Sequence, residues 1–93
     1  MANFTVRVEL HQATGDDYDV LHSAMAQKGF SRLITADNGQ SYQMPWAEYN
    51  GSGNLTSSQV RDIAREAANT TRKNNAVFVT EATTRAWIGL AAR

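Results

Sequence analysis

The chain has 93 residues, of which 42% are hydrophobic and 19% are charged, and this composition is typical of one folded domain rather than of a disordered segment. Nine basic residues balance nine acidic ones, which argues against a protein that binds duplex nucleic acid tightly through a basic surface. The absence of cysteine excludes disulfides, thiol nucleophiles and cysteine-bound zinc. No apolar run is long enough for a membrane span, and no secretory signal is recognisable, so we expect a cytoplasmic protein without a membrane partner.

The beginning of the chain predicts a strand followed by a helix. From Asn3 to His11 apolar and polar residues alternate, which is the period of a strand with one buried face. A helix is expected from Asp16 to Lys28, because Thr14 can cap it and Asp17 stands three residues further on. Gly29 then favours the end of this helix, since glycine readily adopts the left-handed conformation found there.

Two short strands, Phe30–Thr35 and Gln40–Trp46, are expected next. Between them Asn38 and Gly39 form the residue pair that most strongly favours a tight hairpin turn. Pro45 suits an edge or an end of a sheet. We interpret residues 49–54 as a flexible loop, because they are rich in glycine, serine and asparagine.

The clearest local signature begins a second helix, expected from Ser57 to Lys73. Thr56 and Gln59 form a capping box, and Leu55 and Val60 are spaced as its hydrophobic staple. The apolar stripe of this helix is rich in alanine, which implies close packing on a sheet.

A strand over Ala76–Glu81 follows, and Arg85–Leu90 could form a short fifth strand at the C-terminus. The order βαββαβ predicts one α+β domain over residues 1–93, a ferredoxin-like sandwich with two helices on one face of an antiparallel sheet. The other face of the sheet would be open. A common core is expected from Val6, Val8, Leu21, Met25, Ile63, Ala67 and Val79.

Two histidines, His11 and His22, are the candidates for acid–base chemistry, because imidazole titrates at about pH 6.5. The alternative is that both are surface residues without chemistry. They have no third ligand at metal spacing, so no metal site is expected there. Asp16, Asp17 and Asp19 could bind Mg²⁺ together with substrate phosphates, or simply offset the positive end of a helix dipole.

Charge and aromatic residues give a second set of candidates. Residues 1–56 hold three basic and six acidic residues, a net charge of −3, whereas residues 57–93 hold six basic and three acidic, a net charge of +3. Arg61, Arg65 and Arg72 share a helix face and could contact phosphates, or pair with the acidic residues between them. Four aromatic side chains could stack on single-stranded bases or pack in the core: Tyr42, Trp46, Tyr49 and Phe78.

Several segments resemble the GhoS family of small bacterial proteins: Phe4–His11, Leu21–Met25, Gly29–Arg32, Ala36–Gly39 and Tyr42–Pro45. Residues 47–50 also resemble uncharacterised phage and enterobacterial relatives. The resemblance implies a ferredoxin-like fold and the activity of a type V antitoxin, an endoribonuclease that cuts the messenger RNA of its toxin. The family's fold is similar to the small subunit of CRISPR adaptation complexes, which carries a metal-binding Asp after the first strand. Here residues 10–12 contain no carboxylate, so a mechanism without metal or cofactor is expected, and His22 stands where the antitoxin has an Arg.

Two hypotheses remain open. In the first, the chain cleaves single-stranded RNA without a metal, which requires a base, an acid and a cation for the phosphorane. The candidates are His11 and His22 for proton transfer, Arg7 and Arg32 for phosphate contact, and Tyr42 and Phe78 for base stacking. In the second, a non-catalytic phage or accessory protein binds a partner chain or a second copy of itself through a sheet edge or the Arg85–Leu90 strand. The chain would then be a monomer or a weak homodimer.

Overall fold

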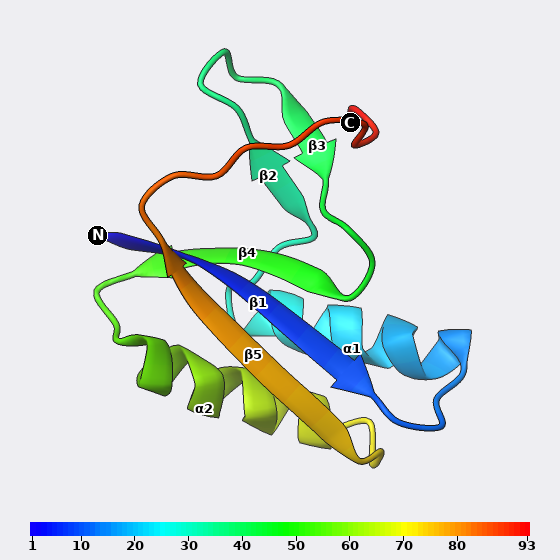
Figure 1. The fold of residues 1–93 in the computed structure, drawn as a ribbon. Coiled ribbons are helices and arrows are strands. Elements are labelled where there is room, and N and C mark those ends of the chain that lie inside the picture. The colour runs from blue at the N-terminus through cyan, green and yellow to red at the C-terminus, as the bar shows by residue number, and fades with distance from the viewer.

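The computed structural model describes all 93 residues, which form antiparallel strands and two helices (Figure 1). In chain order the elements are β1 (Ala2–Leu10), α1 (Gly15–Gln27), β2 (Leu33–Thr35), β3 (Ser41–Gln43), β4 (Glu48–Gly53), α2 (Ser57–Asn69) and β5 (Asn75–Ala82). No helix of the chain has the length and apolar character needed to cross a membrane.

The main sheet has the strand order β4-β1-β5, and β2 and β3 form a separate hairpin. The hairpin is joined to β4 where Ser31 and Asn50 exchange backbone hydrogen bonds of 2.8 and 2.7 Å. The chain before β2 therefore lies next to β4, and the order β5, β1, β4, β2 is that of a ferredoxin-like sandwich. The predicted α+β class is confirmed.

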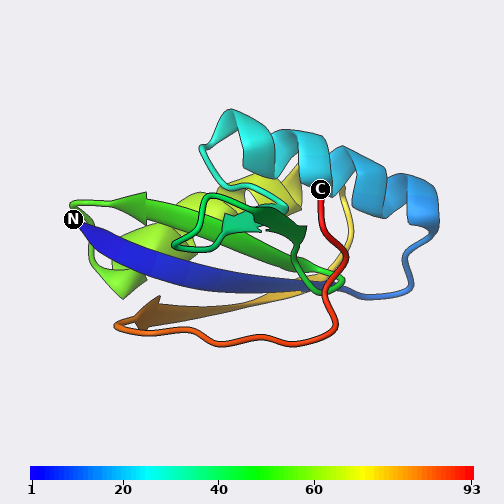
Figure 2. The same ribbon diagram turned by 90° about the horizontal axis from the view of Figure 1, so that it is seen from above.

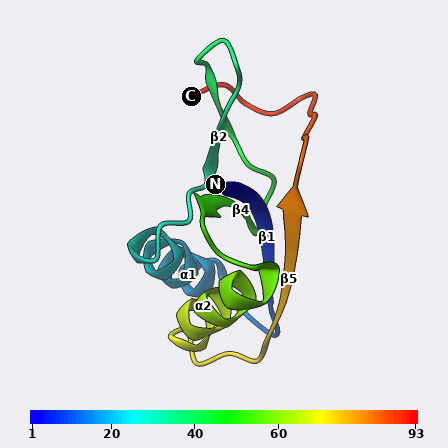
Figure 3. The ribbon, with the colours of Figure 1, turned by 90° about the vertical axis from the view of Figure 1, so that its left-hand side faces the viewer.

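Both helices cover the same face of the sheet (Figures 2 and 3). On the opposite face, the C-terminal segment, residues 83–93, leaves β5 and crosses to the hairpin (Figure 3). Its last residues bond to β3, with Gln43 N–H donating to the Ala91 carbonyl at 2.8 Å and Arg93 N–H to the Ser41 carbonyl at 2.9 Å. The strand expected over residues 85–90 is absent as a regular element, and the C-terminal pairing comes at residues 91–93 instead.

The core lies between the helices and the inward-facing residues of β1. Val6, Val8, Leu21, Met25 and Ala67 are completely buried in one cluster, as predicted. The other two expected members, Ile63 and Val79, pack against this cluster and are partly buried. Burial of these side chains provides the main stabilisation of the fold.

Both predicted helix starts are confirmed as capping boxes. The hydroxyl of Thr14 accepts from Asp17 N–H at 3.3 Å, and that of Thr56 accepts from Gln59 N–H at 3.1 Å. The second helix ends at Asn69 rather than at residue 73. Its chain turns away there, since the hydroxyl of residue 70 bonds the carbonyl of residue 67 and residue 72 has a φ of 62°.

The loop interpretation of residues 49–54 was wrong, because residues 48–53 form β4. Tyr49 is fully buried, and Gly51 pairs with Phe4 of β1. The glycine is needed for packing rather than for flexibility, since a Cβ at this position would lie 2.5 Å from Cδ1 of Phe30.

Candidate functional site

An aromatic and basic cluster lies between α1 and the connection from β3 to β4. We call it the Trp46 cluster, and its members are Tyr18, His22, Arg32, Trp46 and Tyr49. The ring centroid of Trp46 lies 5.1 Å from that of Tyr18 and 5.4 Å from that of His22. Tyr49 is fully buried whereas Trp46 is 59% exposed, so the cluster extends from the core to the surface.

Arg32 fixes the backbone that carries Trp46. Its Nη1 donates to the carbonyl of Pro45 at 2.7 Å and to that of Glu48, and its Nη2 donates to the carbonyl of Met44 at 3.1 Å. Its guanidinium carbon also lies 6.0 Å from the Trp46 ring centroid, within cation–π range. Both terminal nitrogens are thus engaged with the backbone, and Arg32 positions the loop more than it offers a free cation.

His22 and Tyr49 form the polar centre of the cluster, with Nδ1 and Oη separated by 2.6 Å. Burial raises the pKa of Tyr49, so its hydroxyl stays protonated. Burial, together with the charge of Arg32, lowers the pKa of His22, which favours the neutral ring at pH 7. The Tyr49 hydroxyl has no other acceptor in the protein, so we assign Oη–H as donor to Nδ1 and place the imidazole proton on Nε2.

The outer nitrogen of His22 is available to a ligand. Nε2 makes no hydrogen bond within the protein and is not among the fully buried atoms that lack a partner. The assigned tautomer therefore presents an N–H donor beside the exposed Trp46 ring. Such a pair can hold a planar base by stacking and a phosphate or carbonyl oxygen by hydrogen bonding.

A second group of predicted residues lies on the open face of the sheet. Arg7 on β1 and Phe78 on β5 are direct partners in the strand register, and Phe78 is 69% exposed. Arg7 pairs with Glu48 at 3.3 Å. His11 follows the end of β1, with Nε2 3.7 Å from a carboxylate oxygen of Glu9.

The structure separates the six predicted site residues. His22 and Arg32 belong to the Trp46 cluster, while Arg7 and Phe78 lie on the open face and His11 at the end of β1. Tyr42 lies in the hairpin, where its ring centroid is 5.7 Å from that of Trp87. The contact of His22 with Tyr49 could not be found from local sequence, because these residues are 27 positions apart and no motif links them.

The acidic residues of α1 have structural partners. Asp17 accepts from Thr14 N–H at 2.9 Å, a bond that lowers the pKa of its carboxyl, and Lys73 Nζ lies 3.8 Å away. On α2, Arg61 pairs with Asp62 at 2.9 Å. No group of three or more histidine, aspartate or glutamate side chains lies close enough together to hold a metal ion.

Comparison with protein-family models and with curated protein sequences finds no match for this chain. Its function must therefore be inferred from the chemistry of its own side chains. The Trp46 cluster is the place where a predicted site residue, an exposed aromatic ring and an unpaired hydrogen-bond donor meet.

Proposed function

We propose that the chain binds single-stranded RNA at the Trp46 cluster and cleaves it without a metal, the activity that the resemblance to the GhoS family implies. The observation that supports binding is the 59% exposed Trp46 ring next to His22, whose Nε2 has no protein partner. Stacking on an indole is tolerant of base identity and needs no overall positive charge, which suits a chain of net charge zero.

Tyr18 bonds the end of β1 beside His11 and also lies near His22, the two histidines that the cleavage proposal needs. Its hydroxyl accepts from the Leu10 N–H at 3.1 Å, next to His11, and its ring centroid is 6.5 Å from that of His22. An RNA strand that stacks on Trp46 and continues along Tyr18 would approach both imidazoles. In this proposal His11 accepts the proton of the 2′-hydroxyl. His22 acts from its doubly protonated form, in which Nδ1–H donates to Tyr49 Oη and Nε2–H gives its proton to the leaving oxygen.

The binding test is fluorescence anisotropy with a short, unstructured, end-labelled RNA at low and moderate salt, with chelator present. Stacking contributes about 1–3 kcal/mol per base, so Trp46→Ala should weaken binding about 5- to 140-fold. Trp87→Phe is the matched control and should bind like the wild type, because Trp87 lies outside the cluster. Equal affinity of Trp46→Ala and wild type would contradict the proposed site.

Cleavage is followed in the same mixtures by gel separation of the labelled RNA. His22→Asn and His11→Asn should each abolish product. His11→Asn should leave the affinity nearly unchanged, because His11 lies outside the Trp46 cluster, whereas His22→Asn also removes the Nε2 donor and should weaken binding. Product formation by both variants would contradict the acid–base assignment. If the wild-type protein binds the RNA but forms no product, the proposal of RNA binding stands and the proposal of nuclease activity is wrong.

A second candidate function is strand addition at β5. This strand pairs only with β1, so its other edge carries unsatisfied backbone groups next to the exposed Phe78. A partner strand, or β5 of a second copy, could bind there. Light scattering of wild type and of Phe78→Lys at several concentrations tests this function, since a charge at this exposed position should weaken any dimer without changing RNA affinity at the Trp46 cluster.

A further inference from the structure

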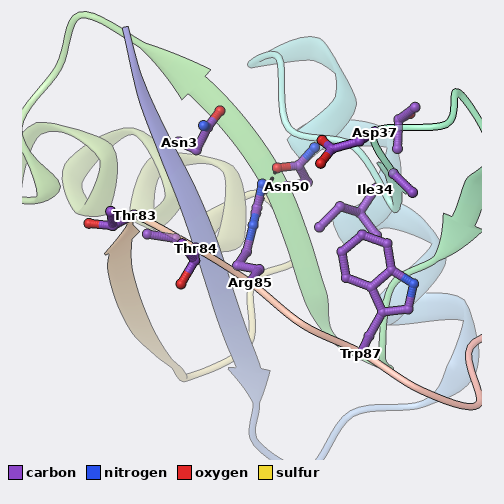
Figure 4. A pocket seen from close by; sticks show the side chains of 11 residues that line it. Asn3, Ile34, Asp37, Asn50, Thr83, Thr84, Arg85 and Trp87 are labelled. Atoms are coloured by element: carbon purple, nitrogen blue, oxygen red, sulfur yellow. Dashed lines mark hydrogen bonds between the residues drawn. The ribbon is translucent and has the colours of Figure 1, made fainter.

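A cleft of about 550 Å³ lies between the open face of the sheet and the C-terminal segment (Figure 4). Its lining includes Asn3 of β1, Asn50 of β4, Ile34 and Asp37 of the hairpin, and Arg85 and Trp87 of the C-terminal segment. The volume falls within the range of about 300–1,000 Å³ that is usual for small-molecule sites. The cleft lies on the opposite face of the sheet from the helices, and none of the Trp46 cluster residues lines it.

Arg85 brings an unpaired positive charge into this cleft. Its Nη1 donates to three neutral oxygens, the carbonyl of Phe4 at 3.3 Å, Oγ1 of Thr5 at 3.2 Å and Oδ1 of Asn50 at 2.9 Å. Nη2 and Nε have no protein acceptor, and no carboxylate lies within ion-pair distance of the guanidinium. The side chain is half-buried, and desolvation lowers its pKa without removing its charge. A half-buried guanidinium in this state is suited to bind a carboxylate or another small anion.

Asp37 brings the opposite charge to the same cleft from the hairpin turn (Figure 4). Its carboxylate makes no ion pair with Arg85 or with any other cation of the chain. A free phosphate or a nucleotide would gain from Arg85 but would be repelled by Asp37. A ligand with both an ammonium and a carboxylate group would instead complement both unpaired charges.

The apolar part of the cleft is preorganised. Trp87 contacts the ring of Tyr42 in an edge arrangement, and Ile34 is buried beside it. The segment that carries Trp87 is held at both ends, by the bonds of Arg85 to the sheet and by those of residues 91 and 93 to β3. An apolar side chain of a ligand can therefore pack on a wall that is already in place.

We propose that this cleft binds a small zwitterion with an apolar side chain, a free amino acid or a dipeptide, with its carboxylate on Arg85, its ammonium group on Asp37 and its side chain against Trp87 and Ile34. The amides of Asn3 and Asn50 complete the polar lining. This inference is independent of RNA binding, because it uses none of the residues of the Trp46 cluster.

The test uses the full chain with Trp46→Phe, so that Trp87 is the only tryptophan and its fluorescence reports on the cleft. Leucine and glycyl-leucine are titrated separately, which distinguishes the amino acid from the dipeptide. N-acetyl-leucine lacks the ammonium group and leucinamide lacks the carboxylate. We expect saturable binding of leucine or glycyl-leucine, and affinities about 10- to 100-fold weaker for the two blocked compounds.

Two variants test which ligand group each of the protein charges contacts. Asp37→Asn should bring the affinity for leucine down to that for N-acetyl-leucine, and it disturbs no protein contact, since Asp37 has no ion-pair partner. Arg85→Gln should reduce the discrimination between leucine and leucinamide. Asp19→Asn, an equal change of charge on α1, is the matched control and should bind like its parent.

Three results would overturn the proposal. The first is that neither zwitterion causes a saturable change in Trp87 fluorescence. The second is that the zwitterions and the blocked compounds bind with equal affinity. The third is tight binding of adenosine monophosphate or inorganic phosphate in place of the zwitterions, which would assign the cleft to phosphorylated ligands. None of these results bears on the RNA experiment, which uses Trp46.

Discussion

Arg32 is the side chain on which the geometry of the Trp46 cluster depends. A single guanidinium donates to the carbonyls of Met44, Pro45 and Glu48 from two separate nitrogens, whereas the three donors of a lysine all radiate from one compact nitrogen and cannot match the same spread. The half-exposed position of Trp46 is therefore a consequence of Arg32. The same contacts explain how an arginine that makes no ion pair is tolerated beside the core.

Arg32→Lys is expected to lower the free energy of unfolding by roughly 1–3 kcal/mol, because at least one carbonyl loses its charged donor. Chemical denaturation measures this change. Arg7→Lys is the control, since Arg7 is exposed and its only partner is Glu48 at 3.3 Å, so its effect should stay within about 0.5 kcal/mol. Equal denaturation midpoints for the two variants would contradict the supporting role of Arg32.

His22 makes the stability of the fold depend on pH. Its pKa in the folded state is lowered from the ordinary value of 6.5 by burial, so below about pH 6.5 the unfolded chain binds a proton that the folded chain does not. The free energy of unfolding should therefore fall as the pH falls through this range and should be fully retained above it.

His22→Asn tests this dependence, because asparagine can still accept from Tyr49 but does not titrate. Denaturation midpoints measured between pH 5 and pH 8, roughly the range over which histidine titrates, should change less in this variant than in the wild type. His11→Asn is the control and should keep the wild-type dependence. If the denaturation midpoint of His22→Asn changes with pH as much as that of the wild type, other groups cause the pH dependence.

Among the elements, β4 is the one for which local composition and tertiary packing disagree. Its sequence alternates small polar residues with glycine, which is the composition of a loop, yet it pairs with β1 over six residues. The strand forms because the buried Tyr49 and the ring of Phe30 pack on its inner face, and Gly51 gives that ring its space. Tertiary contacts thus overrode a weak local preference.

Gly51→Ala should destabilise the protein by about 1–3 kcal/mol, because the new methyl group overlaps the ring of Phe30. Thermal unfolding followed by circular dichroism is the measurement. Gly15→Ala provides the matched control, since nothing lies within 4 Å of a Cβ there, and its melting temperature should be unchanged or higher. An equal decrease of the melting temperature in the two variants would mean that glycine flexibility, rather than the Phe30 contact, matters at residue 51.

The elements with strong local signals could be predicted from the sequence. The alternation in β1 and the capping boxes at Thr14 and Thr56 depend only on neighbouring residues, and each was confirmed. Four members of the Trp46 cluster, His22, Arg32, Trp46 and Tyr49, were singled out one by one from the sequence, but Tyr18 was not, and nothing predicted that they would meet. The cleft was missed entirely, because Arg85 meets Asn50 only after the chain has crossed the sheet, and no local pattern encodes that path.

At the scale of the whole molecule, the C-terminal segment stands apart from the core. No residue beyond Val79 belongs to the core cluster or packs against it. The segment instead links the open face of the sheet to the hairpin through Arg85, Trp87 and residues 91–93. The C-terminal segment is therefore needed to form the cleft but not to form the core.

A chain that ends at Ala82 should still fold, with the far-ultraviolet circular dichroism of its helices retained. The amides of the β2–β3 hairpin should exchange their hydrogens faster, because the backbone hydrogen bonds between β3 and residues 91 and 93 are removed. Hydrogen exchange of the amides in β2 and β3 measures this loss, and the amides of β1 serve as the internal reference. Full unfolding of the shortened chain, or unchanged protection of the hairpin, would contradict this division of the molecule.

The position of β1 between β4 and β5 has a consequence for synthesis on the ribosome. Asn3 pairs with Ala82, so the first strand to emerge is completed by the last one. Until β5 has left the exit tunnel, the apolar face of β1 can be covered from β4 and the helices, but one long edge stays open to other nascent chains. A sheet built in this way is completed only after β5 has been synthesised, and the open edge of β1 is exposed to chaperones and to misassembly until then.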